Sequence, residues 1–238
     1  MTTLSALVVD SLLLSELPRT AGAVHSVFTH VVNIATAGDL WSLAARPVPV
    51  GPRTVRLPLD DLRGLDLVAG TPVTVQGASV TVGSTVVDLA EAVHWEPEAF
   101  ATQVDSRRLV AAIAELERLG VPGGARTGTD PFSIAVAERI ADGLSQVATS
   151  VASADAGALR TAVAGLVGLG AGLTPAGDDV LTGLAFGAAR LDGRLAMIPP
   201  AVLSVIPGST HAVSATALRE ACAGRAIQPL SDLLAAVC

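Results

Sequence analysis

Residues 168–179, with the sequence Gly-Leu-Gly-Ala-Gly-Leu-Thr-Pro-Ala-Gly-Asp-Asp, constrain the fold of this chain more than any other stretch. Apolar, helix-like sequence flanks them at 159–167 and 180–189. Glycine permits positive φ and close approach of backbones, and the first N–H groups of a helix have no partner within the helix. We therefore expect one helix to end before this stretch, a loop to follow, and a new helix to begin at the two aspartates.

Three interpretations of the 168–179 loop stay open at the level of sequence. Free N–H groups at a helix start can bind an anion. Alternatively, the carboxylates of Asp178 and Asp179 could hold a metal such as Mg²⁺. The third interpretation is purely structural: the loop joins packed helices, Asp178 is the N-cap, and Asp179 is a first-turn charge that the helix dipole favours.

The composition excludes several classes of protein. Half of the 238 residues are apolar and only 16% are charged, which indicates a folded chain. The net charge is −7 and there is no basic run, so we expect no nucleic-acid binding. No run of about 18 apolar residues occurs, so we expect no membrane span.

The absence of lysine and tyrosine restricts the chemistry. A Schiff-base lysine, a phosphate-loop lysine and a tyrosine acid or base are all excluded. Proton transfer is left to carboxylates, to Cys222 and Cys238, to four histidines, at 25, 30, 94 and 211, or to substrate and water. The two cysteines form no disulfide framework, and we read no signal peptide, so the expected location is cytoplasmic. The sequence identifies no definite cofactor, and Mg²⁺ is the candidate that the paired aspartates suggest.

The first part of the chain is expected to be β-rich. Short β-branched segments separated by glycine turns suggest a small barrel or sandwich-like domain over residues 1–92. The expected strands are 24–34, 53–57, a hairpin of 73–75 and 80–82, and 85–88.

The remainder, residues 93–238, is expected to be a helical domain that carries the glycine-rich loop, which makes the fold class α+β. Asp130 and Pro131 are typical of a helix start. The expected helices are 109–119, 132–147, 155–167, 179–191, 214–223 and 230–237. Three Gly/Ser/Thr-rich loops precede helices, at 123–131, 168–179 and 207–214, and would form one pocket if they converged.

Residues 170–179 resemble the signature of a family that includes the AllH-type subunit of bacterial oxamate carbamoyltransferase. The usual signature has Ser where this chain has Ala176. Weaker similarities occur at Ser26-Val27-Phe28 with Asn33-Ile34, at Gly51-Pro52 with 53–57, and from Ser209-Thr210 to Ala223-Gly224. The resemblance covers nearly the whole chain.

This resemblance implies a subunit that acts beside partner subunits in anaerobic allantoin breakdown. The complex transfers a carbamoyl group between oxamate and phosphate and gives carbamoyl phosphate. The chain lacks the Ser-Thr-Arg-Thr-Arg loop of aspartate and ornithine carbamoyltransferases. Carbamoyl chemistry here would therefore use a different site, which a partner could share.

The first functional hypothesis is accordingly a carbamoyltransferase-type subunit that binds a small anion: phosphate, oxamate or carbamoyl phosphate. Its partners would be that anionic substrate and other protein subunits. The candidate catalytic residues are His211, Asp178 and Asp179. The candidate ligand-binding residues are Gly170, Gly172, Thr174, Gly177, Arg126 and Thr210.

Two alternatives belong to other classes. One is a Mg²⁺-dependent hydrolase or transferase that uses Asp178 and Asp179, with Asp130 as a further ligand. The other is a non-catalytic structural or regulatory subunit, in which the glycine-rich loop serves packing or assembly and the apolar excess covers an interface.

Overall fold

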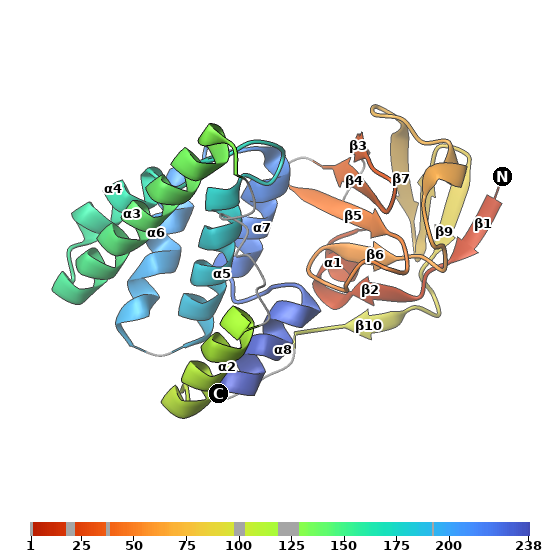
Figure 1. Cartoon of the computed structure of the whole chain (residues 1–238). Helices are drawn as coiled ribbons and strands as arrows, with labels where there is room; N and C mark the ends of the chain where they lie inside the picture. The colour runs from red at the N-terminus through yellow and green to blue at the C-terminus, as the bar shows by residue number, and fades with distance from the viewer. Residues whose placement is uncertain (1, 18–21, 37–38, 98–102, 119–128, 192) are drawn as a thin grey trace. The chain divides into compact units, whose positions relative to one another are not determined.

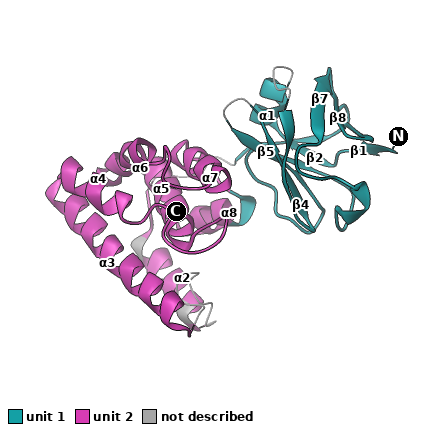
Figure 2. Ribbon diagram, turned by 90° about the horizontal axis from the view of Figure 1, so that it is seen from above, with its two compact units in different colours: residues 1–98, 227–229 teal, residues 99–226, 230–238 magenta. Residues whose placement is uncertain are grey.

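The computed structural model describes residues 2–17, 22–36, 39–97, 103–118, 129–191 and 193–238. The chain forms two compact units. Unit 1 comprises Met1–Glu98 and Ile227–Pro229, and unit 2 comprises Ala99–Ala226 and Leu230–Cys238 (Figure 2). Strands dominate the first unit and helices form the second, so the predicted α+β class, with the β-rich part first, is confirmed.

Unit 1 is built on a ten-stranded curled sheet in the order β1-β9-β8-β7-β3-β4-β5-β6-β2-β10 (Figure 1). Most neighbouring strands are antiparallel, whereas β1–β9, β5–β6 and β2–β10 pair in parallel. The strands are β1 (Thr2–Ser5), β2 (Val8–Asp10), β3 (Gly22–Val27), β4 (Val31–Ala35), β5 (Leu40–Ala44), β6 (Thr54–Arg56), β7 (Pro72–Gln76), β8 (Ser79–Val82), β9 (Thr85–Asp88) and β10 (Val93–Trp95).

The predicted hairpin is confirmed as β7 and β8. Gln76 pairs with Ser79, and Gly77 takes a φ of +59° in the two-residue turn. The single strand predicted over 24–34 is wrong, because the chain reverses within it and forms β3 and β4. The segment that reverses, Phe28 to His30, contains no glycine, proline or asparagine to signal a turn. Phe28 and Thr29 favour strands, so the sequence predicts a continuous strand there.

The core of unit 1 is apolar and fully enclosed. Its buried side chains include Val9, Leu13, Val32, Ile34, Trp41, Leu43, Val55, Leu57, Val80 and Val87. Leu13 comes from a short helix that the sequence did not predict, α1 (Ser11–Glu16). The sequence signal for α1 is weak because a six-residue helix shows less than two turns of periodicity.

Asp10 organises the start of α1 and a distant bend. It is fully buried, and its carboxylate accepts hydrogen bonds from the N–H of Leu12 at 3.3 Å and from the N–H of Arg53 at 2.7 Å. Arg53 has a φ of +54°, which is unusual for a residue with a side chain. Its guanidinium donates from Nε to the Leu40 carbonyl at 2.8 Å and contacts the Glu16 carboxylate at 3.1 Å. These bonds hold an otherwise unfavourable backbone conformation.

Residues 227–229 complete unit 1 although they lie far along the chain. The indole Nε1 of Trp95 donates to Oε1 of Gln228 at 2.7 Å, and the N–H of Gln228 donates to the carbonyl of Val50 at 2.8 Å. A Cβ on Gly51 would crowd the side chain of Ile227.

Unit 2 consists of helices around a second apolar core. The helices are α2 (Ser106–Arg118), α3 (Pro131–Ser153), α4 (Ala156–Ala164), α5 (Ala176–Arg190), the 3₁₀ helix η4 (Arg194–Met197), α6 (Ile198–Val205), α7 (Ala212–Cys222) and α8 (Gln228–Val237), whose first two residues belong to unit 1. Leu159, Leu166, Leu181, Phe186, Ile198, Val202 and Leu218 are among its buried side chains.

The predicted start of α3 is confirmed, since Asp130 caps it by accepting from the N–H groups of Phe132 and Ser133. The helix continues to Ser153, beyond the predicted end, because nothing in its sequence stops it before Ala154 takes a φ of +54°. Helix α6 was missed. It begins with two prolines after Ile198, and proline is compatible only with the first turn of a helix.

The Asp10 contacts lead to a stability prediction. Asp10→Ala leaves the buried N–H of Arg53 without an acceptor, so unit 1 should lose about 2–4 kcal/mol of unfolding free energy. Both tryptophans, Trp41 and Trp95, lie in unit 1, so urea unfolding followed by tryptophan fluorescence reports on this unit.

The matched control is Asp60→Ala. Asp60 has an 84% exposed side chain and forms a surface ion pair with Arg46 at 3.5 Å, so its loss should change stability by less than about 0.5 kcal/mol. An equal effect of the two substitutions would contradict the role assigned to Asp10.

Candidate functional site

The glycine-rich loop joins α4 to α5. Helix α5 begins at Ala176 with Pro175 at its N-cap position, so it starts before the aspartates and not at them as predicted. The φ of Pro175 is −55°, and proline readily takes the first positions of a helix. Asp178 and Asp179 thus lie inside the first turn, where the helix dipole favours negative charge.

The backbone of the loop alternates in sign of φ. Gly168, Gly170 and Gly172 have φ values of +73°, +124° and +90°, whereas the intervening Leu169 and Ala171 have negative φ. Alternation of this kind is typical of concave backbone segments in which successive N–H groups turn to one side. Within the part of the chain that the structure describes, the N–H groups of residues 170–174 make no hydrogen bond.

The loop glycines serve two purposes. A Cβ on Gly168 would overlap the carbonyl oxygen of Ser209, and one on Gly177 would overlap the carbonyl oxygen of Leu166. These two positions require glycine because other backbone segments lie against them. Gly172 has open space around it, and only its positive φ favours glycine there.

Asp178 ties three segments of unit 2 together. Its side chain is 1% exposed. One carboxylate oxygen accepts from the N–H of Gly168 at 2.8 Å, and the other accepts from the hydroxyl of Thr210, which precedes α7. The start of the loop, the first turn of α5 and the segment before α7 are therefore held at one carboxylate.

Asp179 has different surroundings. It is exposed, and partial desolvation, with a smaller contribution from the charge of Asp178, raises the pKa of its carboxyl group. The two neighbouring aspartates do not share one environment. Among the described residues there is no group of three His, Cys, Asp or Glu side chains arranged to hold a metal ion.

A second tie fixes the far end of the loop. The hydroxyl of Ser214, on the first turn of α7, donates to the carbonyl oxygen of Leu173 at 3.1 Å. The Ser214 side chain is 2% exposed. The loops at 168–179 and 207–214 are thus joined by two hydrogen bonds, from Thr210 and from Ser214. Most of the third predicted loop, 123–131, lies outside the described residues.

The other predicted site residues have varied positions. Thr174 is exposed at the loop, and His211 is exposed at the N-cap position of α7 without a side-chain capping bond. Arg126 lies outside the described residues. Ser214 was not predicted as a site residue, because a serine near a helix start is common and carries no sign of a distant partner.

Cys222 offers no nucleophile at neutral pH. Burial raises the pKa of its thiol to about 11, and its Sγ donates to the carbonyl of Pro199 at 3.6 Å. The thiol is therefore protonated and used in packing.

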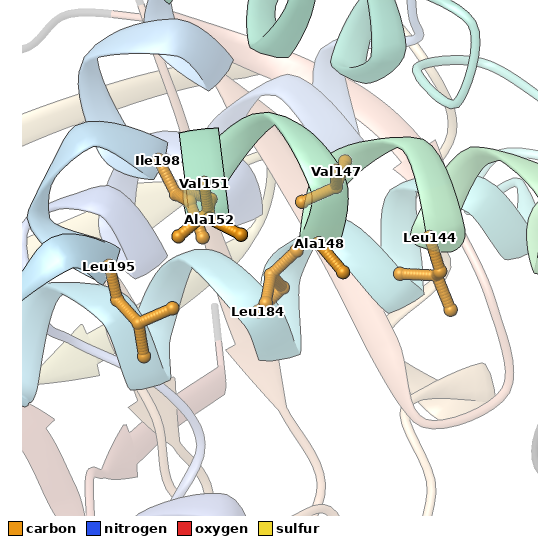
Figure 3. Close-up of a pocket in the computed structure, with 8 residues that line it drawn as sticks. All are labelled: Leu144, Val147, Ala148, Val151, Ala152, Leu184, Leu195 and Ile198. Carbon is orange, nitrogen blue, oxygen red and sulfur yellow. The ribbon is translucent and has the colours of Figure 1, made fainter. Parts of the chain in front are cut away.

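The pocket between α3, α5, η4 and α6 is apolar (Figure 3). It has a volume of about 360 Å³ and is lined by Leu144, Val147, Ala148, Val151, Ala152, Leu184, Leu195 and Ile198. None of these side chains can hydrogen-bond or carry charge, so the pocket offers an anion nothing in exchange for its hydration.

Substitution by alanine should have opposite effects on stability at a crowded glycine and at a glycine in open space. Gly177→Ala forces its Cβ against the Leu166 carbonyl, and we expect a loss of about 3 kcal/mol. Gly187→Ala, in open space on α5, should gain about 0.5–1 kcal/mol, because alanine is the better helix former. Far-UV circular dichroism during thermal unfolding measures the stability of both variants. Equal stabilities would contradict the close approach of the Leu166 carbonyl to Gly177.

The raised pKa of Asp179 predicts a pH dependence. Because the pKa is higher in the folded than in the unfolded chain, ionisation of this group weakens folding. The favourable contribution of the protonated Asp179 carboxyl to the unfolding free energy is fully present below the unfolded-state pKa of about 4. It is lost as the pH rises through the folded-state pKa. Asp179→Asn should therefore be more stable than wild type at pH 7, with the difference shrinking toward pH 4. Chemical denaturation over this range tests it; a pH-independent difference would contradict it.

Two family models match the chain. The AllH family N-terminal domain matches residues 5–94, and the model of oxamate carbamoyltransferase subunit AllH matches residues 166–238. The second match contains the whole of the glycine-rich loop from Gly168, α5 and α7. No curated protein and no solved structure matches. The two matches together span most of the chain, which belongs to the AllH family.

Proposed function

We propose that this AllH-family chain is a subunit of an oxamate carbamoyltransferase-like complex and binds a small anion at the 168–179 loop. The anion would be carbamoyl phosphate, phosphate or oxamate. The family model describes a subunit of that enzyme, which implies other protein subunits as partners. The observation that carries the proposal is the row of unbonded N–H groups at residues 170–174 beside φ values of alternating sign.

Backbone N–H groups suit such an anion for a physical reason. Each is a fixed donor whose orientation is set by the loop, so little reorganisation is needed when the anion binds. The loop also leads directly into the first turn of α5, where the helix dipole favours negative charge, although the N–H of Gly177 already donates to the Leu169 carbonyl and those of Asp178 and Asp179 to the Pro175 carbonyl. Gly170, Gly172 and Gly177 permit the backbone path, and Thr174 adds an exposed hydroxyl at the same place.

The two aspartates oppose an anion at the loop, and this requires compensation. The carboxylate of Asp178 already accepts hydrogen bonds from the N–H of Gly168 and the hydroxyl of Thr210, and these two donors partly offset its negative charge. Asp179 remains exposed. We therefore assign to Arg126 the role of supplying positive charge, because a guanidinium can bind phosphate or carboxylate in a bidentate manner.

His211 is the proposed proton-transfer group. It is exposed at the start of α7 and directly follows Thr210, whose hydroxyl donates to Asp178. Imidazole is the side chain used most often for proton transfer in general acid–base catalysis. Asp178 would then act on the site through Thr210 and Gly168 and not by direct contact with substrate.

A non-catalytic structural or regulatory subunit is the second candidate. Buried Asp178 and the crowded Gly168 and Gly177 favour it, because each is fully accounted for by packing within unit 2. The two candidates differ in one respect: only the first requires the unbonded N–H groups of residues 170–174 to have a ligand.

We also propose a cytoplasmic location, since both cysteines are free thiols. No helix in the described part of the chain combines the length and apolar character needed to cross a bilayer. Nucleic acid is not among the proposed partners, given the net charge of −7.

Anion binding can be tested by thermal shift of the purified chain with phosphate, carbamoyl phosphate, oxamate or Mg²⁺. A ligand at about 100 times its Kd should add roughly 2.7 kcal/mol to the unfolding free energy. We expect stabilisation by at least one anion, and its loss in Gly172→Val, because a β-branched residue resists the φ of +90° and alters the loop.

The control is Gly70→Val in unit 1, where the φ is +86° and the space is equally open. It should lose comparable intrinsic stability and keep the response to anions. Stabilisation by Mg²⁺ alone would restore the metal alternative. No response to any anion would leave the structural or regulatory subunit as the better account.

A further inference from the structure

We propose that Ser214 is a positioning residue that sets the direction of the donor row by holding the carbonyl of Leu173. This inference rests on the proposed function, because it assigns to α7 the control of an anion site formed by the loop before α5. Sequence reasoning had placed Ser214 only at a helix start.

The hydrogen bond at Leu173 fixes an entire peptide plane. The Ser214 hydroxyl donates to the Leu173 carbonyl oxygen at 3.1 Å. In a planar trans peptide, the C=O and the following N–H point in opposite directions. The N–H of Thr174 is therefore directed away from Ser214, and the Leu173 oxygen is kept from facing an anion bound by the neighbouring N–H groups.

The local sequence makes this bond necessary. Gly172 has a φ of +90° and no side chain, so more backbone conformations are open beside Leu173 than another residue would permit. Pro175 follows Thr174 and has no N–H, so Thr174 is the last donor before the helix. Ser214, 2% exposed and held by α7, is the side chain that restrains this flexible section.

The loop is consequently held at both ends, and its first part is held further by the carbonyl of Leu169, which accepts from the N–H of Gly177 at 2.9 Å. Gly168 is held at its N–H by Asp178, whereas Leu173 is held at its C=O by Ser214. Of the unbonded N–H groups, those of residues 170–172 lie between Gly168 and Leu173, and those of Leu173 and Thr174 lie at or directly after the second tie. A backbone held at both ends presents its donors at a lower entropic cost of binding than a free loop.

The test compares Ser214→Ala with wild type in the full chain. Phosphate affinity is measured by titration calorimetry, and amide hydrogen exchange is measured over residues 170–174. We expect phosphate to bind about fivefold more weakly and these amides to exchange faster, in line with the loss of one hydrogen bond. Alanine favours helix, so α7 should stay folded.

Ser150→Ala is the matched control. Ser150 is also a buried serine whose hydroxyl donates to a backbone carbonyl, that of Gln146 at 2.8 Å, but this bond lies within α3. It should leave phosphate affinity and loop exchange unchanged. As a second comparison, Ser214→Thr should retain affinity better than Ser214→Val, because the two side chains have the same shape and only threonine keeps the hydroxyl.

Unchanged phosphate affinity in Ser214→Ala, or equal behaviour of the threonine and valine variants, would overturn the role of Ser214. Failure of the wild-type chain to bind any of the anions would instead overturn the proposed function. In that case, faster amide exchange at residues 170–174 in Ser214→Ala would still support a restraint of the loop by Ser214. Unchanged exchange would overturn that restraint. The failure of the proposed function and the failure of the role of Ser214 are therefore distinguishable.

Discussion

The carboxylate of Asp178 is the interaction on which the helical unit depends. It lies out of contact with water and accepts from a backbone N–H of the loop and a hydroxyl before α7. A buried carboxylate is tolerated only where such donors surround it. The glycines at 168 and 177 follow from this arrangement, because they let the backbone come close enough for the bonds to form. The loop that carries the unbonded N–H groups is held at both ends, by Asp178 and by Ser214.

Unit 1 uses the same device in a different fold. Asp10 is also fully buried, and it accepts the N–H of Arg53, a residue with positive φ, as Asp178 accepts the N–H of Gly168. In both units an aspartate from the start of a helix holds a backbone conformation that the chain would not keep by itself. A carboxylate suits this task because it accepts two hydrogen bonds in different directions.

Sequence reasoning predicted the elements with strong local signals. The hairpin at Gly77, the cap at Asp130 and the division into a β-rich and a helical part follow from turn chemistry, capping and periodicity. It failed at the reversal after Phe28 and at α6, where local preference contradicts the fold. It singled out Asp178 and Thr210 as site residues but not the bond between them, and it missed the bond from Ser214. These contacts join residues 10, 32 and 41 positions apart, and such pairings leave no trace in a single sequence.

The return of residues 227–229 to unit 1 has a topological consequence. Neither unit is one continuous stretch of chain, because the polypeptide leaves the sheet unit, builds most of the helical unit, and then contributes Gln228 to the first. Cleavage of one peptide bond between the units would therefore not release either as an intact body. A fragment that ended at residue 98 would leave the indole of Trp95 without Gln228, and ribosomal synthesis must nearly finish before the sheet unit has all of its parts.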